Sequence, residues 1–266
     1  MPEQAGHRLK AYALAQLQRA IVCLGWRGSH AHDGVHQARK SMRRVRACLA
    51  LGESALGVGA GMLDQELSKI CKSLSSLRDA QARVESLDRL LKKHPEQEKY
   101  SSLLAAKRLA MVARAEAMRN EQVIDMDFLT RRECLRVLLA AMPVLPWQHI
   151  GDDDLSGAML HSAKICNAAA EIALSQGREK DWHRLRRRRR RLIQQYTALE
   201  NSGIELSSIN VPDRKLGTLL GEAQDISILR DFFKLHSGMS EENRKLLRKF
   251  LKREFKHISA EAMAGP

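Results

Sequence analysis

Two stretches of the chain combine one histidine with a regular array of arginines, a set of side chains suited to binding anions. The denser stretch runs from Trp182 to Leu199 and reads WHRLRRRRRRLIQQYTAL; a weaker copy runs from Val35 to Leu51. On a helix that advances about 100° per residue, the histidine and most cations of each stretch share one side, opposite the apolar residues. These cationic sides carry His36, Arg39, Lys40, Arg43, Arg44 and Arg46 in the first helix, and His183, Arg186, Arg187, Arg190 and Arg191 in the second.

The repetition matters more than either helix alone, because a single basic face is usually just solvated. Core positions can recur for packing reasons, but a recurring polar arc points to a shared ligand. Arginine suits a phosphate chain, since its planar fork donates two hydrogen bonds to one phosphate and keeps its charge. The run of six arginines wraps right round its helix, so we expect Arg188 and Arg189 to flank the apolar stripe and lie off the ligand face.

A second pair of similar segments indicates an internal duplication. Lys69 to Asp79 reads KICKSLSSLRD and Lys215 to Asp225 reads KLGTLLGEAQD. The offset from 69 to 215 is 146 residues, and that from His36 to His183 is 147. Two motifs in the same order at nearly equal offsets predict two helical repeats of about four helices each. We place the repeats at residues 1–145 and 153–266, with 146–152 as the linker.

The spacing of apolar residues predicts helices throughout, and no segment shows the sustained alternation of a strand. Asp33 is expected to be the N-cap of the first basic helix, and one long helix is expected over residues 62–94. Pro212 fits the first turn of a later helix, and Ser240 fits the start of the last one. The other expected helices cover residues 7–26, 96–120, 128–142, 155–176 and 180–199. The predicted fold class is all-α.

Composition narrows the class of partner. The net charge of +14 implies a polyanion or an anionic membrane surface as partner. Aromatic residues make up only 4% of the chain, which counts against single-stranded nucleic-acid binding by base stacking. The five cysteines are scattered without a Cys-x-x-Cys pair and indicate reduced thiols. With no signal peptide and no run of about 18 apolar residues, a cytoplasmic protein without a membrane segment is expected.

With these motifs in view, the chain resembles the CHAD family, the conserved histidine α-helical domain, over nearly all of its length. The family signature is a His-x-x-Arg segment that continues into paired arginines, followed by a helix that ends in an Arg-Asp step, all duplicated. Arg78 and Asp79 match the first Arg-Asp step, whereas Gln224 before Asp225 departs from the second. The resemblance implies a single CHAD domain over 1–266, made of two pseudo-twofold-related four-helix bundles with a basic central groove. It also implies binding of inorganic polyphosphate and association with polyphosphate granules in the cytoplasm.

Roles for the remaining candidates follow from their charges. We expect both histidines to donate to phosphate when the ligand is bound, so that binding tightens toward acidic pH. Lys69, Lys72 and Lys215 could extend the groove or be surface lysines on a solvated helix. Asp79 and Asp225 are expected to orient arginines, since a polyanion would repel them.

Three other readings stay open at this point. General nucleic-acid binding fits the charge, although the sequence has no helix-turn-helix, zinc-finger or RNA-binding signature. Metal chelation by His36, His183, Asp79 and Asp225 is opposed by the surrounding arginines and by the lack of zinc-ligand spacing. A phosphoryl-transfer enzyme would need carboxylates for Mg²⁺ and a phosphate-cradling glycine loop, and neither is evident. We therefore expect a binding protein with no catalytic residues, no metal and no cofactor.

Overall fold

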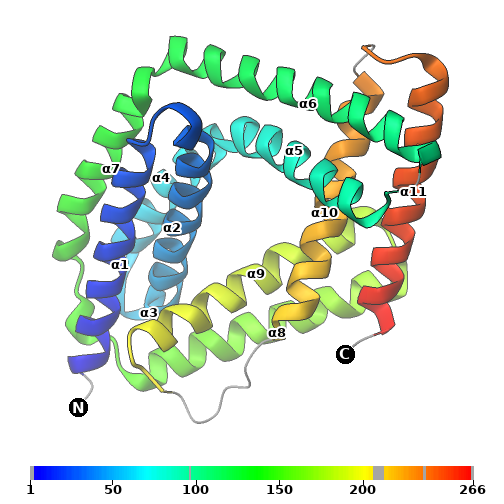
Figure 1. The fold of residues 1–266 in the computed structure, drawn as a ribbon. Helices are drawn as coiled ribbons and strands as arrows, with labels where there is room; N and C mark the ends of the chain where they lie inside the picture. The colour runs from blue at the N-terminus through cyan, green and yellow to red at the C-terminus, as the bar shows by residue number, and fades with distance from the viewer. Residues whose placement is uncertain (1–2, 96, 206–212, 236–237, 265–266) are drawn as a thin grey trace. The chain divides into compact units, whose positions relative to one another are not determined.

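The computed structural model describes residues 3–95, 97–205, 213–235 and 238–264, and every regular element in these ranges is helical (Figure 1). This confirms the predicted all-α class. The helices form two compact units, residues 1–75 with 125–212 and residues 76–124 with 213–266. Each unit therefore takes helices from both predicted repeats. Which helices pack together does not decide which segments are duplicated, so the repeat boundaries stay a prediction.

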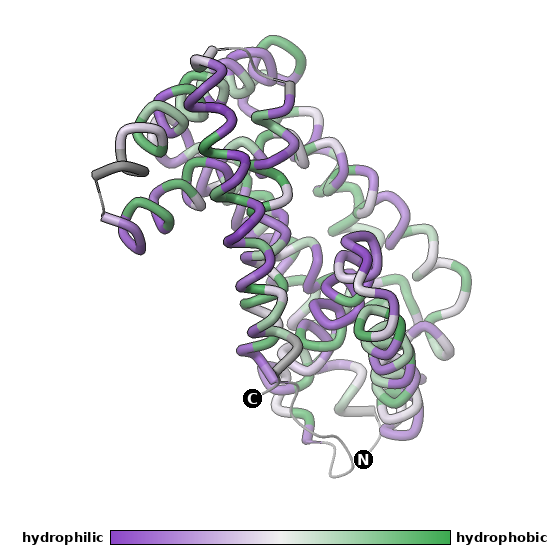
Figure 2. The backbone as a smooth tube through the Cα atoms, turned by 90° about the vertical axis from the view of Figure 1, so that its right-hand side faces the viewer, coloured by the Kyte–Doolittle hydropathy of each residue, from purple (hydrophilic) through white to green (hydrophobic). Residues whose placement is uncertain are grey.

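The first unit holds both basic helices. Its helices are α1 (Glu3–Leu24), α2 (Ala31–Leu51), the short α3 (Glu53–Leu56), α4 (Val58–Ser73), α7 (Leu129–Ala141), α8 (Asp152–Gln176) and α9 (Glu179–Asn201). Helix α2 packs against α1, α4, α8 and α9, and α9 packs on α8. The core is built from the apolar stripes of these helices, with Leu17, Met42 and Leu67 fully buried. Hydrophilic and hydrophobic residues are interspersed along the helices (Figure 2).

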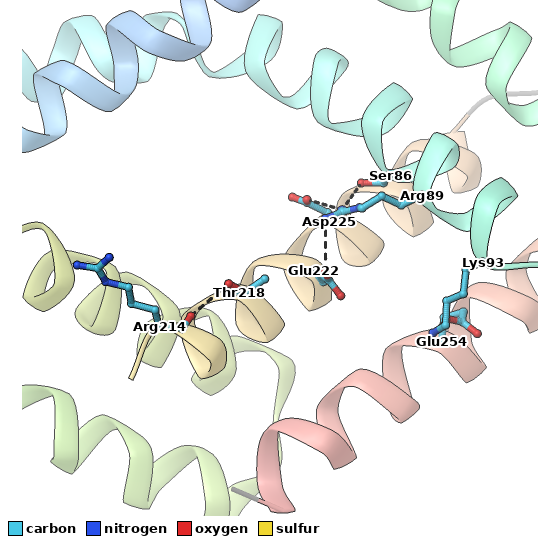
Figure 3. A network of polar contacts seen from close by, with 8 residues as sticks. All are labelled: Ser86, Arg89, Lys93, Arg214, Thr218, Glu222, Asp225 and Glu254. Atoms are coloured by element: carbon cyan, nitrogen blue, oxygen red, sulfur yellow. Dashed lines mark hydrogen bonds and ion pairs between the residues drawn. The ribbon is translucent and has the colours of Figure 1, made fainter. Parts of the chain in front are cut away.

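The second unit contains α5 (Ser75–Lys93), α6 (Gln97–Ile124), α10 (Arg214–Leu235) and α11 (Glu241–Ala264). All four helices contribute to one apolar core, which includes Leu87, Leu103, Leu229 and Phe250. Ion pairs join α5 to its neighbours: Arg89 Nη2 contacts Asp225 Oδ2 at 2.9 Å, and Lys93 Nζ contacts Glu254 Oε2 at 3.0 Å (Figure 3).

The expected long helix over residues 62–94 was wrong, because it is two helices that meet at Leu74. Ser73 donates from its hydroxyl to the Ile70 carbonyl and Ser75 to the Lys72 carbonyl, so side chains compete with the helical ladder at the break. Leu74 itself is fully buried. The apolar period continues through the break, which is why periodicity alone did not reveal it.

Two helix starts were predicted from polar residues, with opposite outcomes. Asp33 is not the N-cap of α2: the 3-10 turn Gly28–His30 leads directly into the helix, and Asp33 lies in its first turn. Its charge still suits that end of the helix dipole. Ser240 does open α11, since its hydroxyl accepts from the Asn243 amide at 3.3 Å. The expectation for Pro212 lies outside the described residues.

Residues 146–152, predicted as a linker, are packed into the first unit. They contain the 3-10 turn Trp147–His149, and the Trp147 indole is 1% exposed and donates to the Met142 carbonyl at 2.8 Å. Helix α1 approaches so closely that a Cβ at Gly6 would lie 1.8 Å from the Trp147 carbonyl oxygen. The proline and glycine here belong to a tight turn that the buried Trp147 and Ile150 anchor in the core.

All five cysteines are free thiols, and all except Cys134 are buried. Within the described ranges, no helix combines the length and the apolar character needed to cross a membrane.

Candidate anion-binding groove

The two basic helices, α2 and α9, meet in the first unit and form one groove of about 370 Å³. Ala47 and Gln194 are its uncharged lining residues. Every other lining residue is an arginine, two from α2 and five from α9: Arg43, Arg46, Arg184, Arg187, Arg188, Arg190 and Arg191. Part of each cationic arc predicted from the sequence thus lines the same cavity.

The apolar side of α9 sets the direction of its arginines. Trp182, Leu185 and Leu199 are buried, so the opposite side of the helix is turned outward. Near the start of the helix the nearly buried Asp181 accepts from Arg178 Nε at 2.6 Å, which neutralises that carboxylate locally. This acid of the first turn is therefore already paired with Arg178.

Electrostatic crowding is greatest at the two arginines that face each other across the helix pair. Burial, reinforced by Arg190 and Arg39, lowers the pKa of Arg43 from its ordinary value to about 9. Burial, reinforced by Arg186 and Arg39, lowers the pKa of Arg190 to about 10. Both groups are still protonated at neutral pH, so the groove holds cations that repel one another. A bound anion would relieve that repulsion.

Two contacts fix the α2 side of the groove. Arg46 forms a bidentate pair with Asp64 of α4, at 2.8 and 3.0 Å, so one cation of the lining has a local partner. Arg43 Nε donates to the Arg39 carbonyl at 3.0 Å, which holds its guanidinium along the helix. These contacts reduce the entropy that the two side chains would lose on binding a ligand.

The other predicted ligands on α2 and α9 lie beside the groove lining. Arg39 and Arg186 are half-buried and close enough to depress the pKa values of Arg43 and Arg190. His36 is half-buried on α2, and His183 Nε2 lies 3.7 Å from Glu179 Oε1, one turn away. None of these four side chains is among the residues that line the cavity.

Lys40 and Arg44 lie on the side of α2 that faces α1. Arg44 Nη1 donates to Gln16 Oε1 of α1 at 3.1 Å. Burial lowers the pKa of Lys40, with further contributions from Arg44 and Arg19. This second group of cations is outside the α2–α9 groove lining.

Sequence reasoning missed two groove residues. Arg184 was not considered, and Arg188 was excluded from the ligand face, yet both line the cavity. The two lie one turn apart at the edge of the polar arc, and the groove extends over that edge. The same exclusion fits Arg189, which instead lies beside the Cys166 thiol of α8. A wider arc around His183 would have included the two missed residues.

The predicted lysines do not line the groove. Lys69 and Lys72 are exposed on α4, and Lys69 Nζ pairs with Glu66 Oε1 at 2.6 Å. Lys215 is exposed on α10 in the second unit.

The predicted orienting carboxylates also belong to the second unit. Asp225 pairs with Arg89 of α5 (Figure 3). Asp79 lies beside Arg83 and opposes the fall in the Arg83 pKa that burial causes. Neither of these arginines was predicted to bind phosphate.

Carboxylates mark the end of the groove. An adjoining cavity of about 560 Å³ shares Arg188 and Arg191 but is also lined by Glu53, Asp153 and Asp154. These acids would repel a polyanion, so they limit how far one could extend in that direction. In the part of the chain that the structure describes, no three His, Cys, Asp or Glu side chains form a group able to hold a metal ion.

The structure thus defines an all-helical protein whose two basic helices share one cationic groove. The CHAD domain family model matches residues 11–234, and the chain belongs to that family. Among curated proteins, none matches the sequence.

Solved structures agree on the fold. PptA from Streptomyces chartreusis is 17% identical with a TM-score of 0.69, and the match covers 99% of this chain and 98% of that one. The CHAD domain from the plant Ricinus communis is 17% identical with a TM-score of 0.61, covering 98% and 92%.

Proposed function

We propose that this protein binds inorganic polyphosphate in the α2–α9 groove, without catalysing a reaction on it. The supporting observation is the lining itself: seven arginines from the two duplicated helices surround one cavity. Repeated guanidinium donors match a chain of repeated phosphates, each of which can accept two hydrogen bonds from one fork. CHAD membership agrees with this ligand and with association with polyphosphate granules in the cytoplasm.

The lining favours a bare phosphate chain over nucleic acid. It contains no aromatic side chain on which a base could stack. Gln194 is its only neutral side chain with hydrogen-bonding groups, which leaves little to read a base edge. Nucleic acid would therefore be held through its phosphates alone and should compete poorly at moderate salt.

The same lining argues for binding without chemistry. It offers no carboxylate or histidine to serve as a general base or to hold Mg²⁺. Arginine stays protonated and is a poor proton acceptor at neutral pH. We therefore assign no catalytic residue.

A competition titration tests the proposal. Labelled long-chain polyphosphate is bound at about physiological salt, where exposed charges are screened beyond about 8 Å, and displaced by unlabelled polyphosphate, DNA or RNA at equal phosphate concentration. The test variant carries Arg184→Gln, Arg187→Gln and Arg188→Gln, three exposed groove residues whose loss should leave the fold intact. The expected results are a preference for polyphosphate and a loss of affinity of at least about tenfold in the variant.

The matched control removes three exposed cations from the second unit: Lys92→Gln, Arg108→Gln and Arg119→Gln. It should keep wild-type affinity. Equal displacement by DNA and polyphosphate would instead indicate a general polyanion surface, and equal losses in both variants would mean that only net charge matters.

A further inference from the structure

The second unit has a strongly cationic groove of its own, between α10 and α11. The cavity measures about 770 Å³, and the two helices pack side by side (Figure 1). Its lining holds a single acid, Glu241. The seven cations that line it are Arg230, Lys234, Arg244, Lys245, Arg248, Lys249 and Lys252. The five on α11 lie beyond residue 234, where the family match ends.

The cations of α11 form a line along one side of the helix. Arg244, Arg248 and Lys252 are spaced four residues apart and span about 12 Å at 1.5 Å per residue. Leu247, Phe250 and Leu251 of the same helix are buried in the core of the unit. Packing against the core therefore turns this row of cations outward, next to Arg230 and Lys234 of α10.

In the described part of the unit, three carboxylates of α10 and α11 pair with cations of α5 and not with those of the groove. Asp225 and Glu222 face Arg89 of α5, and Glu254 pairs with Lys93 (Figure 3). In the groove itself, Lys234 has Asp231 as a partner at 2.7 Å. Among the described residues, none of the five α11 cations has a carboxylate within ion-pair distance. The protein's own carboxylates therefore do not neutralise this row.

One of the groove cations is held in place. The Arg230 guanidinium lies 5.5 Å from the centre of the Phe255 ring of α11, a cation–π contact between the two helices. Among the residues that the structure describes, no aromatic side chain lines the cavity. A ligand here would meet charged donors but no surface for base stacking.

We infer that the α10–α11 groove is a second binding site for a linear phosphate chain, separate in composition from the α2–α9 groove and richer in lysine. The inference rests on the proposed function for the ligand class but on different residues for the site. Lysine ammonium groups bind phosphate as point charges, without the bidentate geometry of arginine. The second site should therefore be weaker and more sensitive to salt than the first.

Calorimetric titration of the full chain with tripolyphosphate tests this at two salt concentrations. Three proteins are compared with wild type: the groove variant R184Q/R187Q/R188Q, an α11 variant R244Q/R248Q/K252Q, and the control K92Q/R108Q/R119Q. Wild type and control should bind two equivalents, and the groove and α11 variants one each. The α11 variant should lose the class of sites with the steeper salt dependence.

The outcomes separate the two proposals. If wild type binds one equivalent that only the groove variant loses, the α10–α11 site is wrong and the proposed function stands. If only the α11 variant loses binding, the α2–α9 assignment is wrong. Absence of binding in wild type would overturn both, and preference of the α10–α11 site for duplex DNA over tripolyphosphate at equal phosphate concentration would overturn the ligand class.

Discussion

At the scale of single residues, the groove places positive charges where burial and neighbouring cations disfavour the charged form. Arg43 and Arg190 are partly withdrawn from water and lie beside Arg39 and Arg186, and their lowered pKa values record both effects. A buried cation next to other cations destabilises the free protein, and a bound anion stabilises such a cation more than it would an exposed one. Stability and binding should therefore respond in opposite directions to the same substitution.

Replacing Arg190 with Met tests that opposition. Met keeps much of the side-chain volume and removes a buried charge, a change that is often neutral or stabilising by about 1–4 kcal/mol. We expect a higher Tm for Arg190→Met without ligand and weaker polyphosphate binding. The exposed Arg184→Met should weaken binding with little change in Tm. A lower Tm for Arg190→Met, measured by calorimetry in phosphate-free buffer, would contradict this account.

The lowered pKa values also predict a pH dependence of binding. The anion favours the protonated form, so the contribution of these two arginines to affinity should be complete well below pH 9 and should fall as pH rises through the Arg43 pKa of about 9 and the Arg190 pKa of about 10. For the free protein the sign is reversed: the penalty for charged Arg43 is present below about pH 9 and is lost as pH rises from there toward the higher ordinary pKa of arginine.

Titration of affinity from about pH 8 to about pH 10.5 checks this prediction. Exposed lysines begin to lose charge near the top of that range, so Arg43→Met is the reference. The charged groups around Arg43 are Arg39, Arg186 and Arg190, together with the Cys71 thiol, whose pKa burial raises. The fall in affinity near pH 9 should be present in wild type and absent from Arg43→Met. Identical profiles for the two proteins would rule out Arg43 as its source.

At the scale of elements, glycines permit the close packing that places the basic helix. A Cβ at Gly34 of α2 would lie 2.2 Å from the Cys23 carbonyl oxygen at the end of α1. The backbone cannot yield there without moving α2 away from α1. The position of the arginines on α2 therefore depends on a residue with no charge.

Gly34→Ala should destabilise the protein by about 1–3 kcal/mol, because overpacking against backbone displaces a helix. Gly61→Ala on α4 is the matched control: nothing lies within 4 Å of the added methyl, so it should be neutral or stabilising by about 0.5–1 kcal/mol. Urea denaturation measures both. Equal effects of the two substitutions would show that helix propensity, and not the α1–α2 approach, determines the result.

At the scale of the whole molecule, the chain passes between its two compact units three times, near residues 75, 124 and 212. Neither unit is a continuous segment. Helix α2 lies in the first predicted repeat, and α9, which packs on it, lies in the second. The groove is thus assembled from segments about 147 residues apart, as the offset of His183 from His36 shows.

Fragments cut at the predicted repeat boundary should not fold alone. Residues 1–145 lack α8 and α9, and residues 153–266 lack α1, α2 and α4, so each would expose apolar faces that the intact chain buries. We expect neither fragment to show a cooperative thermal transition by circular dichroism. Mixing the two fragments should restore one. A cooperative transition in either fragment by itself would contradict this prediction.

Helices and their cationic sides were predictable from the sequence, because a helix repeats every 3.6 residues and its polar arc can be read locally. The all-α class and five of the seven groove arginines followed from that periodicity, and the ordered motifs carried the resemblance to the family. Only the tertiary structure decided that α2 and α9 share one cavity, that Arg46 is tied to Asp64, and that Arg184 and Arg188 belong to the lining. It also decided that the apolar period from 62 to 94 is broken at Leu74. The shared cavity depends on contacts between segments far apart in the chain, and the break at Leu74 involves local side-chain hydrogen bonds; neither alters the apolar period.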